Sequence, residues 1–368
     1  MALRRGRGIA TIEYPTGMNQ GGDPSQAWIK IKPDGRIDVF SGTVDLGQGS
    51  KTVHTQIAAD MIGVPYEWVT MNNADTDSSP VSFGTFASRG TFIDGNAIAV
   101  AAYRAKQRLL EVASRMMEVD AEDLDIGGGE VSVTGAPERK LSVEEVASTA
   151  AWSYGEMLVG SGAWMFPHVE PDKETGECEP HAAISYASCV VDVEVDDETG
   201  EVRILRILQA YDVGRAINPV LVEGQIQGGA IMGLGLAVLE ESFPFYPSLE
   251  HRGAQLGTYV APGMRDLPEM VNVVIEDPDP VGPYGAKAIG EMANNGQGPA
   301  TAAAIHDAVG VWVTEMPARP DRVLRALEEP REPRRDGRRV IFDEHLSTAT
   351  VSSREPGPDG WLFPLVGE

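Results

Sequence analysis

The sequence contains very little cysteine. Its two cysteines, Cys178 and Cys189, are too few for a disulfide framework. They are also too few for an iron–sulfur cluster, which needs about four thiolates, so any such centre must lie on another chain. Two isolated thiols are typical of a reducing compartment, and we expect the protein to be cytoplasmic.

Positive charge is also scarce, with 30 basic residues against 55 acidic ones and a net charge of −25. Nucleic-acid binding needs basic patches, so we do not expect nucleic acid as a partner; an acidic, solvated surface explains the charge. We find no run of about 18 apolar residues and expect no membrane span. The basic start of the chain lacks the apolar stretch of a secretory signal.

Glycine, by contrast, is frequent, with 41 among 368 residues. Alternating patterns predict one hairpin over 27–45 and a second over 185–210, each around a turn sequence. The similar hairpins predict an α+β fold with two lobes of related construction. We place the first lobe at 1–165, the second at 166–327 and an irregular tail at 328–368, which we expect to wrap a neighbouring subunit.

Helices are predicted where apolar residues recur at helical spacing, at 52–62, 96–117, 222–240 and 297–309. Further strands are predicted at 66–72 and 270–277. Ser142-Val-Glu-Glu fits a capping box before a short helix. Residues 73–95 form a long polar loop, which is usually functional inside a compact domain. Residues 166–182 are expected to be a linker or flap between the lobes.

The first motif is Leu46-Gly-Gln-Gly49, between a predicted strand and a predicted helix. Its glycines let backbone N–H groups approach a ligand, and the N-terminus of the following helix favours an anion. Gln48 can donate and accept at once, which suits a heterocyclic ring edge or an oxo group. The structural alternative is a tight turn with a capping glutamine.

The second motif is Gly84-Thr-Phe-Ala-Ser-Arg-Gly-Thr91, just before a helix. Ser88, Thr91 and the N–H groups near Gly90 are suited to hold a phosphate, with Arg89 as a bidentate partner. The alternative is a hydroxyl-rich cap for the helix that begins near Asn96.

The third motif is Asp212-Val-Gly-Arg-Ala-Ile-Asn-Pro219, followed by a glycine-rich segment from Glu223 to Gly235. The glycine spacing does not match a dinucleotide-binding loop after a strand. We instead predict a glycine-lined helix that packs closely around a cofactor.

The fourth motif is Gly285-Ala-Lys-Ala-Ile-Gly-Glu291. It is not a Walker loop, because Ala288 follows Lys287 where Ser or Thr is required. A carboxylate in a turn of small and apolar residues is expected to be partly desolvated, and desolvation raises a carboxyl pKa toward the range useful for a general base. The alternative is a solvated Glu291 that caps the next helix.

In this order, the four segments resemble the molybdenum-binding subunit of the xanthine dehydrogenase and aldehyde oxidase family. Leu-Gly-Gln-Gly near the start with Gly-Ala-Lys-x-x-Gly-Glu near the end is a specific combination, as is Asp-Val-Gly-x-x-x-Asn-Pro before Gly-Gln-x-x-Gly-Gly. The resemblance covers residues 5–327.

The resemblance implies a two-lobed molybdopterin-binding fold and a molybdopterin cofactor, with a cytosine dinucleotide in most bacterial members. The cofactor would carry molybdenum without a metal ligand from the protein. Glu291 matches the family's general base, and Gly290 matches a residue beside the metal. Further cofactor contacts are implied for Leu46, Gly47, Gln48, Gly49, Ala87, Ser88, Arg89, Gly90, Thr91 and Gln225.

The sequence departs from the family in two positions and in extent. Met292-Ala293 replaces a frequent Pro-Pro, and Met232 stands where the helix often has a second glutamine. Only the second, C-terminal half of the family's long molybdenum subunit is represented. We therefore expect a split subunit, similar to the medium molybdenum subunit of nicotinate dehydrogenase, with the first half on a separate chain and with 2Fe-2S and FAD subunits completing the electron path.

The activity implied by the resemblance is hydroxylation of an electron-poor carbon in an N-heteroaromatic, purine or aldehyde substrate, with water as the oxygen source. A reductive dehydroxylase similar to hydroxybenzoyl-coenzyme A reductases and a non-catalytic assembly subunit remain alternatives, and a carbon monoxide dehydrogenase is disfavoured. Phe83, Phe86 and Tyr284 are candidates for the substrate pocket, although buried aromatics are more often core residues.

Overall fold

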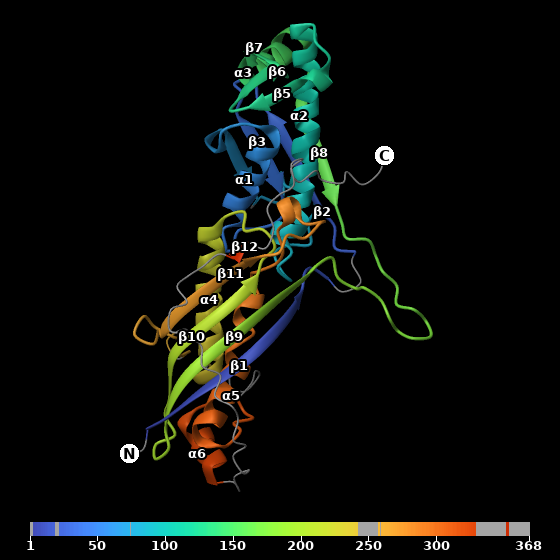
Figure 1. Cartoon of the computed structure of the whole chain (residues 1–368). Helices are drawn as coiled ribbons and strands as arrows, with labels where there is room; N and C mark the ends of the chain where they lie inside the picture. The colour runs from blue at the N-terminus through green and yellow to red at the C-terminus, as the bar shows by residue number, and fades with distance from the viewer. Residues whose placement is uncertain are drawn as a thin grey trace.

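The computed structural model describes residues 3–18, 22–73, 75–241, 257, 259–328 and 351–352. Over these residues the chain forms two lobes that lie end to end (Figure 1). One lobe contains the long helix α2 (Gly95–Met117), and the other contains the long strands of a five-stranded sheet. The predicted α+β class with two lobes is confirmed.

The first lobe is built on a four-stranded sheet in the order β4-β3-β2-β8. The first predicted hairpin is present as β2 (Ser25–Ile31) and β3 (Ile37–Ser41), with alternate residues buried. β4 (Val69–Asn72) runs parallel to β3, and β8 (Leu158–Trp164) pairs antiparallel with β2. Helices α1 (Ser50–Ile62) and α2 pack on these strands, as their apolar spacing predicted.

A small three-stranded sheet extends this lobe. The predicted capping box is present, because Ser142 Oγ accepts from the Glu145 N–H at 3.1 Å and the Glu145 carboxylate accepts from the Ser142 N–H at 2.7 Å. The remaining elements of the lobe are β5 (Leu124–Gly127), β6 (Glu130–Val133), β7 (Ala136–Ser142), α3 (Val143–Thr149) and the turns η1 (Tyr66–Trp68), η3 (Ala121–Asp123) and η4 (Ala150–Tyr154).

The second lobe is built on a five-stranded sheet in the order β1-β9-β10-β11-β12. The second predicted hairpin is present as β9 (Ile184–Asp196) and β10 (Val202–Asp212), and β11 (Glu269–Glu276) runs parallel to β10. The other elements are β1 (Leu3–Pro15), β12 (Val351–Ser352), α4 (Pro219–Val238), α5 (Gln297–Val309), α6 (Pro320–Glu328) and the turns η6 (Pro283–Gly285) and η7 (Met292–Asn294).

Strand β1 was not predicted, and it changes the predicted lobe boundary. It pairs with β9 along its whole length, so residues 3–15 belong by hydrogen bonding to the sheet of the second lobe. Its buried face begins with Gly6 and Gly8, which give no apolar signal to an alternating pattern. Residues 166–182 contain no helix or strand, as expected for a flap, whereas the predicted tail lies outside the described residues except for Glu328 and β12.

The two lobes use the same contact between a glycine-containing strand and an alanine-rich helix. A Cβ on Gly8 would lie 2.0 Å from the Ala300 carbonyl oxygen of α5, and one on Gly160 of β8 would lie 2.1 Å from the Ala101 carbonyl oxygen of α2. Such distances allow no side chain, so each helix packs directly against strand backbone. This shared packing agrees with the prediction of two lobes of related construction.

Helix α4 is long and apolar enough to cross a membrane by length and composition, which the sequence reading had not found. A helix in the core of a protein can have the same length and apolar composition without crossing a membrane. In the structure α4 packs against α5, β11 and η7, and its cap residue Asn218 donates to Gln56 of α1 at 3.1 Å. These contacts hold one face of α4 against the protein, and 39% of its apolar window is buried.

We expect Gly8→Ala to lower the free energy of unfolding by about 1–3 kcal/mol, because the added methyl group overlaps the backbone of α5. Gly127→Ala is the matched control, since Gly127 also lies in a strand but a Cβ there would have no neighbour within 4 Å. Urea unfolding followed by circular dichroism measures both. Equal stability of the two variants would contradict the packing described here.

Candidate functional site

The predicted motifs meet where the two lobes join. The residues before Leu46 are tied to the second motif, because the Thr85 hydroxyl donates to the Val44 carbonyl at 2.7 Å and accepts from the Val44 N–H at 3.0 Å. On its other side, the first motif contacts helix α4: a Cβ on Gly49 would lie 2.7 Å from the Leu221 side chain. Segments from both lobes therefore surround a common point.

Glu291 lies against the second motif. Its backbone N–H donates to Ser88 Oγ at 2.8 Å, and its Oε1 accepts from the Ala87 N–H at 3.1 Å. Its Oε2 accepts from the hydroxyl of Tyr14, which in turn accepts from the Ser88 hydroxyl at 3.2 Å. Tyr14 was not predicted, because it comes from the unrecognised strand β1, 277 residues away in sequence.

The expectation that Glu291 is partly desolvated is wrong for the chain as described, since its side chain is exposed. The apolar neighbour Met292 is fully buried, but it packs in the core with Tyr211 and Ile226. The alternative of a helix cap is also not found, because Glu291 precedes η7 without a side-chain capping hydrogen bond. The carboxylate instead faces the Ser88 loop, which we define as residues 84–91.

A buried polar network fixes the turn that follows Glu291. The carbonyl of Ala293 accepts from the Tyr211 hydroxyl at 3.1 Å and from the Gln297 amide at 3.0 Å. Gln209 links the two donors, at 3.1 Å from Tyr211 and 3.0 Å from Gln297. Burial raises the pKa of Tyr211, so this hydroxyl stays protonated and keeps donating.

The third and fourth motifs are joined by a largely buried ion pair. Lys287 Nζ lies 2.7 Å from Asp212 Oδ2, and both side chains are about nine-tenths buried. The Lys287 N–H also donates to the Val213 carbonyl at 2.8 Å. The lysine of Gly-Ala-Lys therefore positions the loop that carries Glu291.

The Ser88 loop holds an unusual backbone. Ala87 and Ser88 have φ values of 46° and 49°, in the left-handed region that residues other than glycine rarely adopt. Such a conformation costs about 1–3 kcal/mol per residue and persists only where the surroundings enforce it. Strain of this kind is common at functional sites.

The next residue, Arg89, enforces that conformation. Its guanidinium is fully buried, pairs with Asp23 and Asp94 at 3.1 Å each, and also donates to the Gly84 carbonyl at 3.0 Å. The predicted role of the Arg89 side chain as a bidentate phosphate partner is therefore wrong, because its donors are already used inside the protein. The acidic partners come from segments outside the motif, so the motif alone did not reveal them.

Gly90 and Thr91 begin a continuous helix formed by the turn η2 (Gly90–Asp94) and α2. No side chain caps this end, and Gly90 and Thr91 are half-buried. An uncapped helix N-terminus suits a phosphate, which agrees with the predicted contacts of these two residues. The predicted hydroxyl-rich cap at Asn96 is absent, since the Asn96 side chain donates to the Val281 carbonyl at 3.0 Å.

Asp45 occupies the helix N-terminus at the first motif. Its carboxylate accepts from the N–H groups of Gly47, Gly49 and Lys51 at 2.8, 3.3 and 2.9 Å. The anion predicted for this end of α1 is thus supplied by the chain itself. Partial burial alone would raise the pKa of Asp45, but these three donors outweigh it and lower the pKa.

Gln48 is also engaged within this loop. Its side chain accepts from the Leu46 N–H at 2.5 Å and donates to the Val44 carbonyl at 3.1 Å. What the loop offers to a ligand is its surface: Leu46 is 73% exposed, and Gly47 has no atom within 4 Å of a built Cβ. Leu46 and Gly47 are therefore open to a ligand, whereas Gln48 uses its amide within the turn and Gly49 packs against Leu221.

The glycines of α4 divide into two faces. Gly229 and Gly233 pack against Ala293 and Gln297, so the prediction that they surround a cofactor is wrong for this face. Gly224 and Gly228 are exposed and have no atom within 4 Å of a built Cβ. Gln225 lies half-buried beside them, and its amide has no hydrogen-bond partner among the described residues.

These features fit a pterin cofactor. Open glycine backbone at Gly47, Gly224 and Gly228 permits close approach of a flat ring, and the Gln225 amide can meet its polar edge. Gly290 lies beside the Ser88 loop, since a Cβ there would be 3.4 Å from Ser88 Oγ. Within the described ranges no group of three His, Cys, Asp or Glu side chains could hold a metal ion.

The three aromatic candidates for a substrate pocket have different environments. Phe83 is 56% exposed, and the ring of Phe86 lies 5.7 Å from the Arg89 guanidinium. Tyr284 packs against the core of the first lobe and interacts with Asp60, and burial raises its pKa. Tyr284 is therefore a core residue, whereas Phe83 and Phe86 remain candidates.

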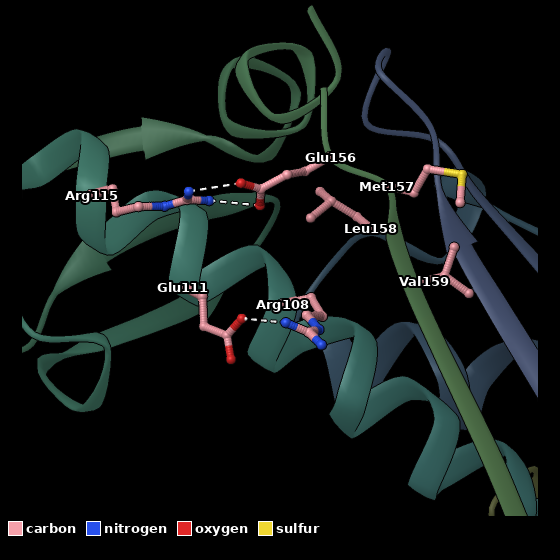
Figure 2. A pocket seen from close by; sticks show the side chains of 7 residues that line it. All are labelled: Arg108, Glu111, Arg115, Glu156, Met157, Leu158 and Val159. Atoms are coloured by element: carbon pink, nitrogen blue, oxygen red, sulfur yellow. Dashed lines mark hydrogen bonds and ion pairs between the residues drawn. The ribbon is translucent and has the colours of Figure 1, made fainter. Parts of the chain in front are cut away.

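A surface cavity of about 650 Å³ lies far from the motifs, between α2 and the start of β8 (Figure 2). Its polar walls are two ion pairs, Arg108–Glu111 at 3.0 Å and Arg115–Glu156 at 2.7 Å. The remaining lining residues are Met157, Leu158 and Val159. No motif residue lines this cavity, and we assign it no role in the site.

We expect Asp45→Ala to lower the free energy of unfolding at pH 7 by about 0.5–2 kcal/mol, the usual cost of losing a capping side chain. Because the folded pKa is lowered, the contribution of the charge is present above the unfolded value of about 3.9 and is lost as pH falls through the folded value. Unfolding curves at several pH values measure this. Lys51→Ala is the control, since it keeps the backbone donor; a difference between the variants that does not shrink in acid would contradict the assignment.

Comparison with known proteins agrees with this site. A family model for the molybdopterin cofactor-binding domain matches residues 2–268. The chain is 32% identical over 327 residues to the probable hypoxanthine oxidase XdhD of Escherichia coli (strain K12), covering 88% of this chain and 32% of that protein. It is 31% identical over 309 residues to the nicotine 6-hydroxylase large subunit of Paenarthrobacter nicotinovorans, covering 82% and 36%.

Among solved structures, the fold is similar to quinoline 2-oxidoreductase from Pseudomonas putida 86, with a TM-score of 0.77 and 27% identity over 89% of this chain and 42% of that chain. The chain thus spans between 32% and 42% of the length of these relatives. The matched family covers most of the sequence and includes three of the four motifs. The chain belongs to the molybdopterin cofactor-binding family, as a molybdenum-binding subunit of the xanthine dehydrogenase and aldehyde oxidase type.

Proposed function

We propose that this chain forms part of the active site of a molybdenum hydroxylase in which Glu291 is the general base. The observation that carries the proposal is the position of the Glu291 carboxylate, held by Tyr14 and Ala87 at the junction where the motifs converge. The reaction would hydroxylate an electron-poor carbon of an N-heteroaromatic, purine or aldehyde substrate with oxygen from water. The relatives named for hypoxanthine, nicotine and quinoline favour a nitrogen heterocycle.

The cofactor would lie between the first motif, the open face of α4 and the start of η2. Gln225 would bind the pterin edge, and the N–H groups of Gly90 and Thr91 would bind phosphate, including that of a cytosine dinucleotide form. When bound, the cofactor supplies molybdenum, which accepts the electron pair that leaves the substrate carbon. Glu291 would accept the proton of the attacking water oxygen on a carboxylate oxygen, as a general base in hydrogen-bond reach does.

The site needs a covering partner. Glu291, Leu46 and Gly228 are exposed, whereas a hydroxylase base and its cofactor work in a site that excludes water. We propose that the first molybdenum-binding half, on a separate chain, covers this surface. Separate 2Fe-2S and FAD subunits would carry the electrons away, in a cytoplasmic complex; the relative from Paenarthrobacter is itself named as a large subunit.

Glu291→Gln should lower kcat by about 10²–10⁴-fold, the usual contribution of a general base, while molybdenum content stays at the wild-type level. Steady-state kinetics and metal analysis of the purified complex measure the two quantities. Glu13→Gln is the control, because Glu13 is also an exposed glutamate near the junction. Turnover near wild type in Glu291→Gln would reject Glu291 as the base.

Gln225→Leu should lower the molybdenum and pterin content of the complex several-fold, because the substitution keeps the side-chain size but removes the amide that would meet the pterin. Gln227→Leu is the control on the same helix, since that side chain is exposed and bonded to Glu223 at 3.2 Å. Cofactor content is measured by metal analysis and by fluorescence of the released pterin. Equal content in both variants would place the pterin elsewhere.

A further inference from the structure

We propose that Tyr14 is a positioning residue for the base: its hydroxyl is the donor that orients Glu291 Oε2 and stabilises the ionised carboxylate. This inference rests on the proposed function of Glu291 and adds a residue that none of the four motifs contains.

The hydrogen bonds around Glu291 form a closed ring with a fixed direction. Ser88 Oγ accepts from the Glu291 N–H, so its single proton is available for the Tyr14 oxygen. Tyr14 accepts that proton and can give its own only to Glu291 Oε2. Each donor in such a ring polarises the next, so the bond to the carboxylate is strengthened.

Tyr14 is held rigidly. It lies near the end of β1, which pairs along its full length with β9, where it faces Ser185. Just after the strand, the Gly17 N–H donates to the Ala87 carbonyl at 3.0 Å, which fixes the Ser88 loop against the same segment. The hydroxyl is therefore placed by backbone contacts on both sides, as a positioning group requires.

Tyr14 remains a donor at any working pH. Burial and the hydrogen bond to the Glu291 carboxylate raise the pKa of Tyr14, so the phenol does not ionise. A donor to the charged form of a carboxyl group favours that form. Tyr14 therefore always presents a proton to Glu291 Oε2 and does not become a negative neighbour of the carboxylate.

No other charged group takes this role among the described residues. From the loop of Glu291 itself, Lys287 is turned toward Asp212 at 2.7 Å. From the Ser88 loop, Arg89 is turned into the protein toward Asp23 and Asp94, and Ser88 is neutral. From β1, Tyr14 makes the contact, and helix α4 makes no ion pair or hydrogen bond with Glu291 in the part of the chain that the structure describes.

The test is Tyr14→Phe in the purified, cofactor-loaded complex, with Tyr186→Phe as the matched control on the neighbouring strand. Tyr186 is 56% exposed and lies opposite Glu13, so the control removes a hydroxyl of the same sheet outside the ring. We expect the acid limb of the kcat–pH profile to move up by about one to two pH units in Tyr14→Phe, because the lost bond is one to a charged group. KM and molybdenum content should stay at wild-type values, and Tyr186→Phe should match wild type.

A second readout does not depend on activity. The infrared difference between wild type and Glu291→Gln isolates the carboxyl band of Glu291, and its pH titration can be followed in the purified chain with or without cofactor. Tyr14→Phe should move this titration in the same direction as the acid limb. If Tyr14→Phe fails to fold, 3-fluorotyrosine at position 14, a stronger donor, should move the titration the opposite way.

The outcomes separate the two proposals. An unmoved titration and an unmoved acid limb in Tyr14→Phe, with Glu291→Gln inactive, would overturn the role of Tyr14 alone. Full activity of Glu291→Gln would overturn the proposed base, whatever the infrared titration gives. A shift of equal size in Tyr186→Phe would also overturn the role of Tyr14, because the effect would then belong to the sheet.

Discussion

The buried guanidinium of Arg89 is the constraint on which the candidate site depends. An arginine with no exposed surface is tolerated only when its charge is compensated, and here two carboxylates and three backbone carbonyls meet it. Removing one partner of such a buried group typically costs about 3–5 kcal/mol, which is comparable to the combined strain of about 2–6 kcal/mol in the adjacent left-handed residues Ala87 and Ser88. The network can therefore hold the backbone that contacts Glu291 in a conformation it would not adopt alone.

Arg89 fixes the Ser88 loop, and Glu291 is then held by contacts from both lobes. The first lobe supplies the Ser88 loop, which binds the Glu291 N–H and, through Ala87, one carboxylate oxygen. The second lobe holds the turn that follows, where Tyr211 and Gln297 both donate to the Ala293 carbonyl. Strand β1 belongs to the sheet of the second lobe but ends beside the Ser88 loop, so it carries Tyr14 across the junction. Glu291 is thus placed by both lobes together, and neither lobe alone contains all of its partners.

Much of this arrangement could be predicted from the sequence. The predictions that were missing or wrong share a physical cause. Apolar spacing predicts both hairpins, and the helices α1, α2 and α5 begin and end within two residues of the predicted bounds. Strands β1 and β8 were missed because glycines on their inner faces give no apolar signal, although close helix contact requires them. The motifs identified which residues converge on the site. They could not show that Arg89 and Gln48 use their donors internally, or that Asp45 and Tyr14 take part, because hydrogen-bond partners depend on three-dimensional contacts.

A general base must be both oriented and desolvated. The exposure of Glu291 shows that, within this chain, the first condition is met without the second. Orientation is provided within this chain, since both carboxylate oxygens and the backbone N–H have partners. Desolvation is not provided, because Glu291 is exposed while the apolar residues that follow it, Met292 and Ala293, pack in the core. A rigid, polar surface can stay in contact with solvent before assembly at little cost in free energy. Its oriented groups become more effective in catalysis when another surface excludes water from them. This chain therefore orients Glu291 by itself, and under the proposed function a partner chain would exclude water from it.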